Sequence, residues 1–198
     1  MSKYKHGNEE TYKTLAKTTA EMLPKHMEGK LLDIGCYKGY LRKYLPLTVK
    51  YIGLDLDKWF SEVVKCDLNN GKLPFKTNEF DFVIVANVLE HIFYPDKICE
   101  EIRRILKPRG MAIISLPNDL GISSKYSHLF EEPEYFEKQK YGHHWIFSVK
   151  TAKRFIGRYF KIIDERCCNE QILSKFDFIL KHFPTFCTIY YMKVIQKG

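Results

Sequence analysis

The amino-acid sequence predicts an α/β fold with a doubly wound, mostly parallel sheet that helices cover on both faces. Short apolar runs typical of buried strands recur along the chain, and segments with apolar residues at helical spacing separate them. A chain of 198 residues suits a single domain. Its 45% of apolar residues are enough to bury a core, which excludes a wholly disordered chain.

Five strands are expected in the first two thirds of the chain, each a short apolar run bounded by polar or turn-forming residues. They are Lys30–Ile34, Lys50–Leu54, Glu62–Cys66, Phe80–Ala86 and Met111–Leu116. Gly39–Leu45 is expected to be helical, whereas Asp57–Ser61 leaves little room for a helix. One side of the sheet is therefore expected to be thinly covered near the third strand.

Two longer helices are predicted from the spacing of apolar residues. One spans Glu9–Met27 and is expected to end near Gly29, because glycine is a common stop signal. We expect Asp96 to cap the other helix and Lys107–Gly110 to end it. Its apolar face is formed by Ile98, Ile102, Ile105 and Leu106.

The last third of the chain is less regular. Asp119–Tyr141 is polar and aromatic without a clear period, which is typical of a long loop or lid. Beyond it we expect a helix over Ser148–Tyr159, a strand over Phe160–Arg166, a helix over Ile172–Phe183 and a strand over Phe186–Ile195. The single domain would thus comprise an N-terminal helix (1–29), a core (30–118), a lid (119–147) and C-terminal helices and strands (148–198).

Charge and cysteine content limit the environment and the partners. Residues 137–198 hold 12 Lys or Arg against 5 Asp or Glu, a basic surface that attracts phosphate groups, nucleic acid or an anionic membrane, or serves only solubility. No apolar run reaches the roughly 20 residues of a membrane helix, and the first residues lack the apolar core of a signal peptide. Six cysteines, none in a Cys-x-x-Cys motif, predict reduced thiols in the cytoplasm and no metal site.

The turn after the first strand carries the first chemical signal. Gly35 and Gly39 let the backbone turn tightly, and Asp33 places a carboxylate just before it. Asp55 ends the second strand, where an acid can accept hydrogen bonds from both hydroxyls of a ribose. An acid at Asp33 would repel a pyrophosphate but suits an ammonium or sulfonium group. Ribose recognition combined with positive charge points to S-adenosylmethionine.

Four segments of the chain occur in an order that is specific, although each alone is common. They are Leu31–Cys36, Tyr51–Leu56, Leu73–Ile92 and Glu101–Asn118. In this order they resemble the class I S-adenosylmethionine-dependent methyltransferases, of the small-molecule subgroup with a Leu-Glu-His segment. The resemblance covers about residues 30–118. It implies a Rossmann-like fold, S-adenosyl-L-methionine as cofactor and S-adenosyl-L-homocysteine as product.

The resemblance also implies cofactor-binding roles for residues that follow the strands. Asp33 and the glycine turn would hold the methionine part of the cofactor, Asp55 the ribose and Leu56 the adenine ring. The implied set is Asp33, Gly35, Cys36, Gly39, Asp55, Leu56, Asp67, Leu68, Asn87 and Val88. Asp67 is either an adenine ligand or a turn residue, because Asp-Leu-Asn-Asn-Gly is rich in turn formers.

One departure from the family pattern concerns the glycine turn. Tyr37 replaces its middle glycine, which requires either a negative φ or a backbone strain of roughly 1–3 kcal/mol. Its ring could pack against the cofactor or lie on the surface as an ordinary aromatic residue.

Two histidines are candidates for catalysis, where the acceptor must lose a proton. His91 follows the fourth strand at the ligand-binding edge, with Glu90 to orient it or act alone, although a packing role is equally consistent. His143 and His144 form the second candidate. Adjacent side chains seldom point the same way, so one of the two, taken as His143, is expected to face the acceptor.

The acceptor class is predicted from what the chain lacks and from its composition. Methyltransferases of exocyclic base nitrogens resemble one another in an Asp/Asn-Pro-Pro-Tyr/Phe motif, and Asn87–Glu90 has no such motif. Aromatic residues in 130–145 and the basic last third favour a small acceptor that is amphiphilic or phosphorylated, such as a lipid-linked or glycan-like molecule. Peripheral membrane contact stays open. The alternatives are a catalytically silent cofactor-binding module and an RNA-directed methyltransferase.

Overall fold

The computed structural model describes residues 9–119, 143–168 and 187–196. These residues form a seven-stranded sheet in the order β3-β2-β1-β4-β5-β7-β6. Strands β1 (Gly29–Ile34), β2 (Val49–Asp55), β3 (Val63–Lys65), β4 (Phe80–Ala86) and β5 (Leu106–Pro117) are parallel. Strand β7 (Ile189–Gln196) is antiparallel to both β5 and β6 (Phe160–Cys168). The mostly parallel, doubly wound sheet was predicted correctly.

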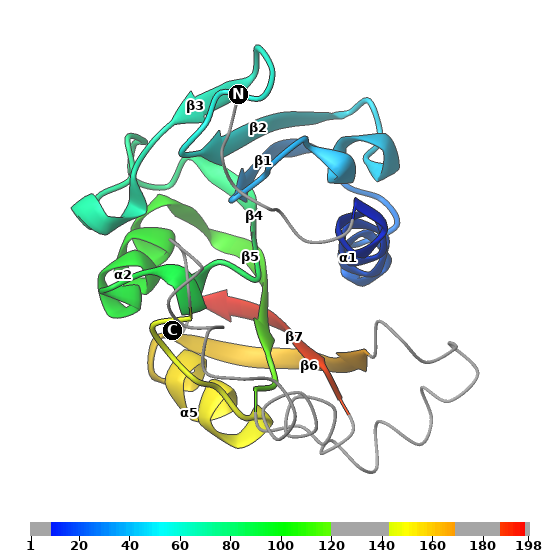
Figure 1. Ribbon diagram of the computed structural model, residues 1–198. Helices are drawn as coiled ribbons and strands as arrows, with labels where there is room; N and C mark the ends of the chain where they lie inside the picture. The colour runs from blue at the N-terminus through cyan, green and yellow to red at the C-terminus, as the bar shows by residue number, and fades with distance from the viewer. Residues whose placement is uncertain (1–8, 120–142, 169–186, 197–198) are drawn as a thin grey trace.

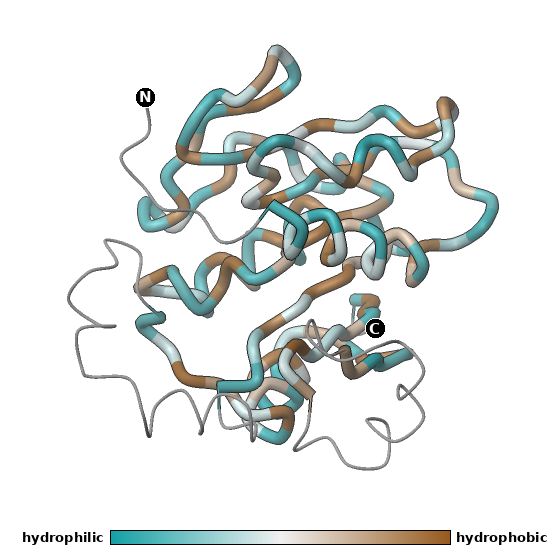
Figure 2. Tube along the Cα trace, turned by 45° about the vertical axis from the view of Figure 1, so that its right-hand side comes forward, coloured by the Kyte–Doolittle hydropathy of each residue, from teal (hydrophilic) through white to brown (hydrophobic). Residues whose placement is uncertain are grey.

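Helices cover the two faces of this sheet (Figure 1). Helix α1 (Glu9–Met22) packs on one face, and helices α2 (Pro95–Ile105) and α5 (Val149–Tyr159) pack on the other. Because successive side chains of a strand point to opposite faces, Leu31 joins the cluster under α1 whereas Leu32 joins the cluster under α2 and α5. Figure 2 shows how hydrophobic and hydrophilic residues are distributed along the chain.

Connections between the first four strands, which the structure describes in full, contain 3-10 turns and no α-helix. A 3-10 helix, η1 (Tyr40–Tyr44), replaces the helix expected over Gly39–Leu45, and η2 (Leu68–Asn70) follows β3. As predicted, Asp57–Ser61 holds no helix. A third 3-10 turn, η3 (Leu89–His91), follows β4. The carboxyl ends of the central strands therefore lead directly into turns, which leaves the edge of the sheet accessible to a ligand.

Several predicted boundaries were wrong for local reasons. Helix α1 ends at Met22 and not Met27, because Pro24 disfavours helical backbone at the residue before it. Asp96 does not cap α2: Tyr94 occupies the N-cap position, without a side-chain capping hydrogen bond, and Asp96 lies in the first turn, where it accepts a hydrogen bond from the hydroxyl of Tyr159. Lys107–Gly110 belong to β5, where a bulge opposite β4 accommodates them.

Other predictions hold or lie outside the described residues. Ser148 caps α5 through a reciprocal pair of hydrogen bonds with Thr151, in agreement with the expected helix. The helix expected over Ile172–Phe183 and most of the lid, residues 120–142, lie outside the described residues. Within the described part, no helix is both long and apolar enough to cross a bilayer.

Candidate active site

The glycine turn lies between the ends of β1 and β4. Gly35 has a φ of 71°, and a β-carbon there would come within 2.4 Å of a methyl carbon of Val88. Gly39 has a φ of 67°, and a β-carbon there would come within 2.8 Å of the ring of Phe60. Glycine is required at both positions, because larger residues would clash and adopt a strained backbone. The turn is thus packed against Val88, one of the residues that the family resemblance implies for cofactor binding.

Tyr37 adopts a positive φ of 45° at the middle glycine position. The strained alternative is therefore the correct one. Its ring centroid lies 5.0 Å from that of Tyr12 and 4.6 Å from that of Trp59, so the ring packs among aromatic side chains of the protein itself. These contacts offset the cost of the unfavourable backbone conformation.

Asp55 is held in place by the backbone of two turns. One carboxylate oxygen accepts a hydrogen bond from the amide of Tyr37 at 2.9 Å, and the other accepts one from the amide of Asp57 at 3.2 Å. Each oxygen can accept a further hydrogen bond. The carboxylate therefore links the glycine turn to the end of β2 and is oriented before any ribose arrives.

Asp33 is buried, with 6% of its surface exposed, and among the described residues its carboxylate accepts a hydrogen bond from the hydroxyl of Tyr51. Burial raises the pKa of Asp33 to about 7, while a 2.7 Å hydrogen bond from the hydroxyl of Tyr51 opposes this shift and the charge of Asp55 adds to it. A cation beside Asp33 would stabilise its charged form. Neighbouring Cys36 is also buried, and burial raises the pKa of its thiol, which stays neutral.

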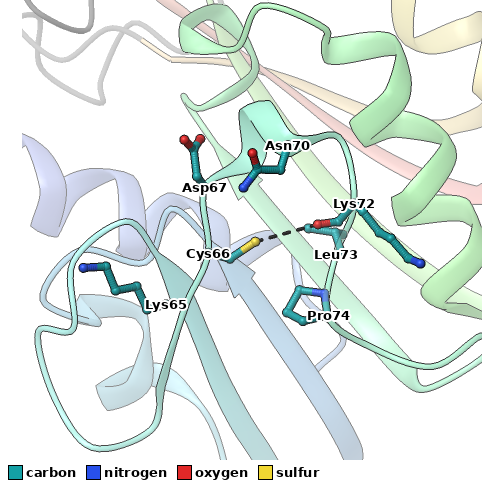
Figure 3. Close-up of a pocket in the computed structure, with 7 residues that line it drawn as sticks. All are labelled: Lys65, Cys66, Asp67, Asn70, Lys72, Leu73 and Pro74. Carbon is teal, nitrogen blue, oxygen red and sulfur yellow. Dashed lines mark hydrogen bonds between the residues drawn. The ribbon is translucent and has the colours of Figure 1, made fainter.

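Asp67 forms a turn, as one of the two interpretations predicted. Its carboxylate accepts a hydrogen bond from the amide of Asn69 at 2.9 Å and caps η2. A pocket lies beside it, and Figure 3 shows Cys66 and Asp67 across from the loop that carries Leu73. The pocket is lined by Lys65, Cys66, Asp67, Asn70, Lys72, Leu73 and Pro74. An adenine contact by Asp67 or Leu68 stays a prediction.

Asn87 ties the ends of β4 and β5 together. Its side-chain oxygen accepts a hydrogen bond from the hydroxyl of Ser115 at 2.8 Å, and its backbone N–H donates to the backbone carbonyl of Ser115 at 3.1 Å. Its φ of 53° is one that asparagine tolerates better than most residues. This geometry turns the chain sharply toward η3 and the histidine that follows.

A cluster of four titratable side chains, Glu90, His91, Asp119 and His143, lies beyond the ends of β4 and β5. Nδ1 of His143 lies 2.9 Å from Oδ1 of Asp119, and the rings of His91 and His143 are 5.0 Å apart. Nε2 of His91 lies 3.9 Å from Oε1 of Glu90. The amides of His144 and Trp145 donate to the carbonyl of Glu90 at 2.8 and 3.3 Å, which fixes the second segment against the first.

Burial and neighbouring charges oppose each other in this cluster. Glu90 is 1% exposed, and burial raises its pKa to about 8; the charge of His143 opposes the shift and that of Asp119 adds to it. Burial disfavours the charged form of His143, but the hydrogen bond to Asp119 and the charges of Glu90 and Asp119 outweigh it, so its pKa is raised.

The structure distinguishes between the two adjacent histidines. His143 points into the cluster, whereas the ring of His144 stacks on Phe93 at 4.3 Å. Sequence reasoning missed Asp119. The available signal was its place two residues beyond the end of β5, close to the carboxyl edge where Asp55 ends β2.

Sheet order, glycine turn and acids at the strand ends together define the class, a class I methyltransferase fold with its ligand site at the carboxyl edge. A family model described as a methyltransferase domain matches residues 32–114. A protein of Methanocaldococcus jannaschii is 33% identical over 147 residues, 71% of this chain and 67% of that protein. The chain belongs to the S-adenosylmethionine-dependent methyltransferase family.

A further relative agrees with this result, and a solved structure shares the fold. A probable S-adenosylmethionine-dependent methyltransferase of Mycolicibacterium smegmatis is 28% identical over 102 residues, 47% of this chain but 40% of that protein. The solved structure of 1,6-didemethyltoxoflavin-N1-methyltransferase from Burkholderia thailandensis, which contains S-adenosylhomocysteine, has a TM-score of 0.65 at 15% identity, covering 95% of this chain and 80% of that one. The predicted enzyme class and cofactor are confirmed.

Proposed function

We propose that the protein transfers a methyl group from S-adenosylmethionine to a small amphiphilic acceptor whose reacting atom lies at the Glu90, His91 and His143 cluster. Transfer is a direct in-line displacement. The acceptor forms a bond to the methyl carbon, and the electrons of the broken carbon–sulfur bond neutralise the sulfonium. Alignment supplies much of the rate, and a proton is removed where the acceptor carries one.

An exposed apolar patch beside this cluster carries the proposal. The patch consists of Phe93, Tyr94, Trp145 and Ile146, which are 54%, 58%, 43% and 59% exposed. Its two segments are joined, because Nε1 of Trp145 donates to the carbonyl of Ile92 at 2.9 Å. Exposed apolar side chains that gather at one place mark a binding surface for apolar groups.

A cation borders the patch and suits a polar head group on the acceptor. Nζ of Lys97 lies 4.8 Å from the ring centroid of Tyr94. A molecule with an apolar part and an anionic group could contact the patch and Lys97 together. Such an acceptor matches the amphiphilic or phosphorylated class expected from the composition.

The test uses the whole chain with S-adenosylmethionine labelled in its methyl group. Incubation with separate lipid, aqueous and RNA fractions from the source cells is followed by extraction and counting. We expect label in the organic phase with the lipid fraction. Label confined to the aqueous metabolites or to RNA would refute the amphiphilic acceptor, and no label in any fraction would favour a silent cofactor-binding module.

A pair of variants tests the role of the patch. Phe93→Ser removes an exposed ring of the patch and should raise KM for the labelled lipid several-fold, with little change in kcat. Leu47→Ser is the matched control, because Leu47 is also exposed but lies on the connection between β1 and β2. Equal KM values for both variants would show that the patch does not bind the acceptor.

A further inference from the structure

Three side chains with metal-ligating atoms meet at the end of β4. Glu90, His91 and His143 each offer one oxygen or nitrogen, and these atoms all lie within 4.8 Å of one another. The ligands come from two segments more than fifty residues apart, so no local motif in the sequence predicts them. We propose that they bind one divalent first-row transition ion of the Zn²⁺ type, with Asp119 orienting His143.

The spacing of the three atoms is close to what such an ion requires. Ligands about 2.1 Å from a tetrahedral ion lie about 3.4 Å apart. Oε1 of Glu90 and Nε2 of His91 are already within 3.9 Å. Closing the remaining gaps takes about 1.5 Å or less, which rotations of the imidazole rings can supply without a change in the backbone.

Asp119 occupies the position of an outer carboxylate. Its 2.9 Å contact with Nδ1 of His143 fixes the ring and leaves Nε2 as the nitrogen for an ion. Histidine ligands of metals commonly donate their second N–H to a carboxylate in this way, which orients the ring and strengthens it as a ligand.

Glu90 provides an independent indication that something binds there. Its carboxyl group is 1% exposed, and among the described residues Oε2 has no hydrogen-bond partner. A buried polar atom without a partner is unfavourable, so few are retained without a reason. An ion bound by both carboxylate oxygens of Glu90 would satisfy Oε2. The two neutral imidazoles would complete the site, in which Glu90 is the one negatively charged ligand.

The donor set selects among ions. Two imidazole nitrogens and one carboxylate suit Zn²⁺ and its transition-metal neighbours, whereas Mg²⁺ prefers six oxygen ligands. Three protein ligands leave a coordination position open, as in catalytic rather than structural zinc sites. An oxygen of the acceptor could fill it and lose its proton more readily. This role, unlike the binding itself, rests on the proposed function, and it would make His91 and His143 ligands instead of bases.

Isothermal titration of the metal-stripped full chain with ZnCl₂ tests the site without cofactor or acceptor. We expect one equivalent to bind, and MgCl₂ to give no comparable heat. Glu90→Gln and His143→Asn should each weaken Zn²⁺ binding at least about 100-fold, and Asp119→Asn about 10- to 100-fold. His144→Asn is the matched control and should leave affinity unchanged, because its ring stacks on Phe93 outside the cluster. Circular dichroism checks the fold of each variant.

Cysteines could also bind Zn²⁺, so a second measurement identifies the ligands. Titration with CoCl₂ should give d–d absorption without the thiolate-to-metal charge transfer that a cysteine ligand produces. The proposal is overturned by absence of Zn²⁺ binding, by equal affinity in Glu90→Gln, or by a thiolate spectrum. None of these results would affect methyl transfer to a lipid acceptor, and failure of that transfer would leave the metal titration unchanged.

Discussion

Tyr37 allows backbone strain and side-chain packing to be measured separately at one position. Tyr37→Ala removes the ring but keeps a β-carbon at a φ of 45°. The lost contacts with Tyr12 and Trp59 contribute about 0.5–1.5 kcal/mol each, and lost apolar burial adds about 1–2 kcal/mol. We expect the free energy of unfolding to fall by about 2–5 kcal/mol in this variant.

Tyr37→Gly loses the same contacts but relieves the strain. A left-handed conformation costs a residue with a β-carbon about 1–2 kcal/mol. The greater freedom of glycine in the unfolded chain lowers the stability of the glycine variant by about 0.4–1 kcal/mol. The glycine variant should therefore be more stable than the alanine variant by about 0.8 kcal/mol, the difference between the midpoints of these two ranges.

Urea unfolding followed by circular dichroism gives both free energies under identical conditions. Lys43 supplies the control, since it is exposed and lies in η1 with no positive φ. There, Lys43→Gly should be less stable than Lys43→Ala, the usual order in a helix. If alanine is as stable as glycine at Tyr37, the backbone there is not strained and the reasoning fails.

Three further predictions concern the cofactor end of the site and the support of the sheet. Asp55→Ala should weaken S-adenosylhomocysteine binding by about 1.5–3 kcal/mol, roughly 10- to 150-fold; unchanged affinity by calorimetry in a folded variant would contradict the ribose assignment. Burial holds the pKa of Asp33 at about 7, above the value of about 3.9 expected in the unfolded chain, so the folded state binds the extra proton between them. Stability should thus fall as pH rises from about 4 to about 7, by up to about 1.4 kcal/mol per pH unit, and urea titrations of Asp33→Asn should lack this slope; equal slopes would show that Asp33 does not titrate there. Arg104 donates hydrogen bonds to Glu101 and to the carbonyls of Leu73 and Phe75, so Arg104→Ala should lower the free energy of unfolding by about 1–3 kcal/mol, and a Tm equal to that of wild type would contradict this.

The strands and α2 could be predicted because their signals are local. A run such as Phe80–Ala86 is apolar throughout, as a strand buried on both faces must be, and the structure reproduces its bounds. Helix α2 was evident from isoleucines at helical spacing, but its cap was not. Asp96 accepts a hydrogen bond from Tyr159, a residue of another helix, and no local sequence pattern predicts such a partner.

The candidate site was only half predictable for the same reason. Acids at the strand ends follow from the order of strands, so Asp33 and Asp55 could be named from the sequence. The pairing of Asp119 with His143 joins residues 24 positions apart and exists only after folding. The φ of Tyr37 likewise depends on the ring contacts that pay for its strain.

The place of β7 between β5 and β6 sets an order of events during synthesis. Among the described strands, β6 is hydrogen-bonded to β7 and to no other. While the ribosome is still making residues 189–196, β6 has no neighbour to join, whereas β1 to β5 can already pair. The half of the sheet that carries the glycine turn can thus assemble first, and one late strand then attaches β6 to it. A released chain that is truncated before Ile189 should therefore protect β1 and β4 from proteases while β6 remains open to cleavage.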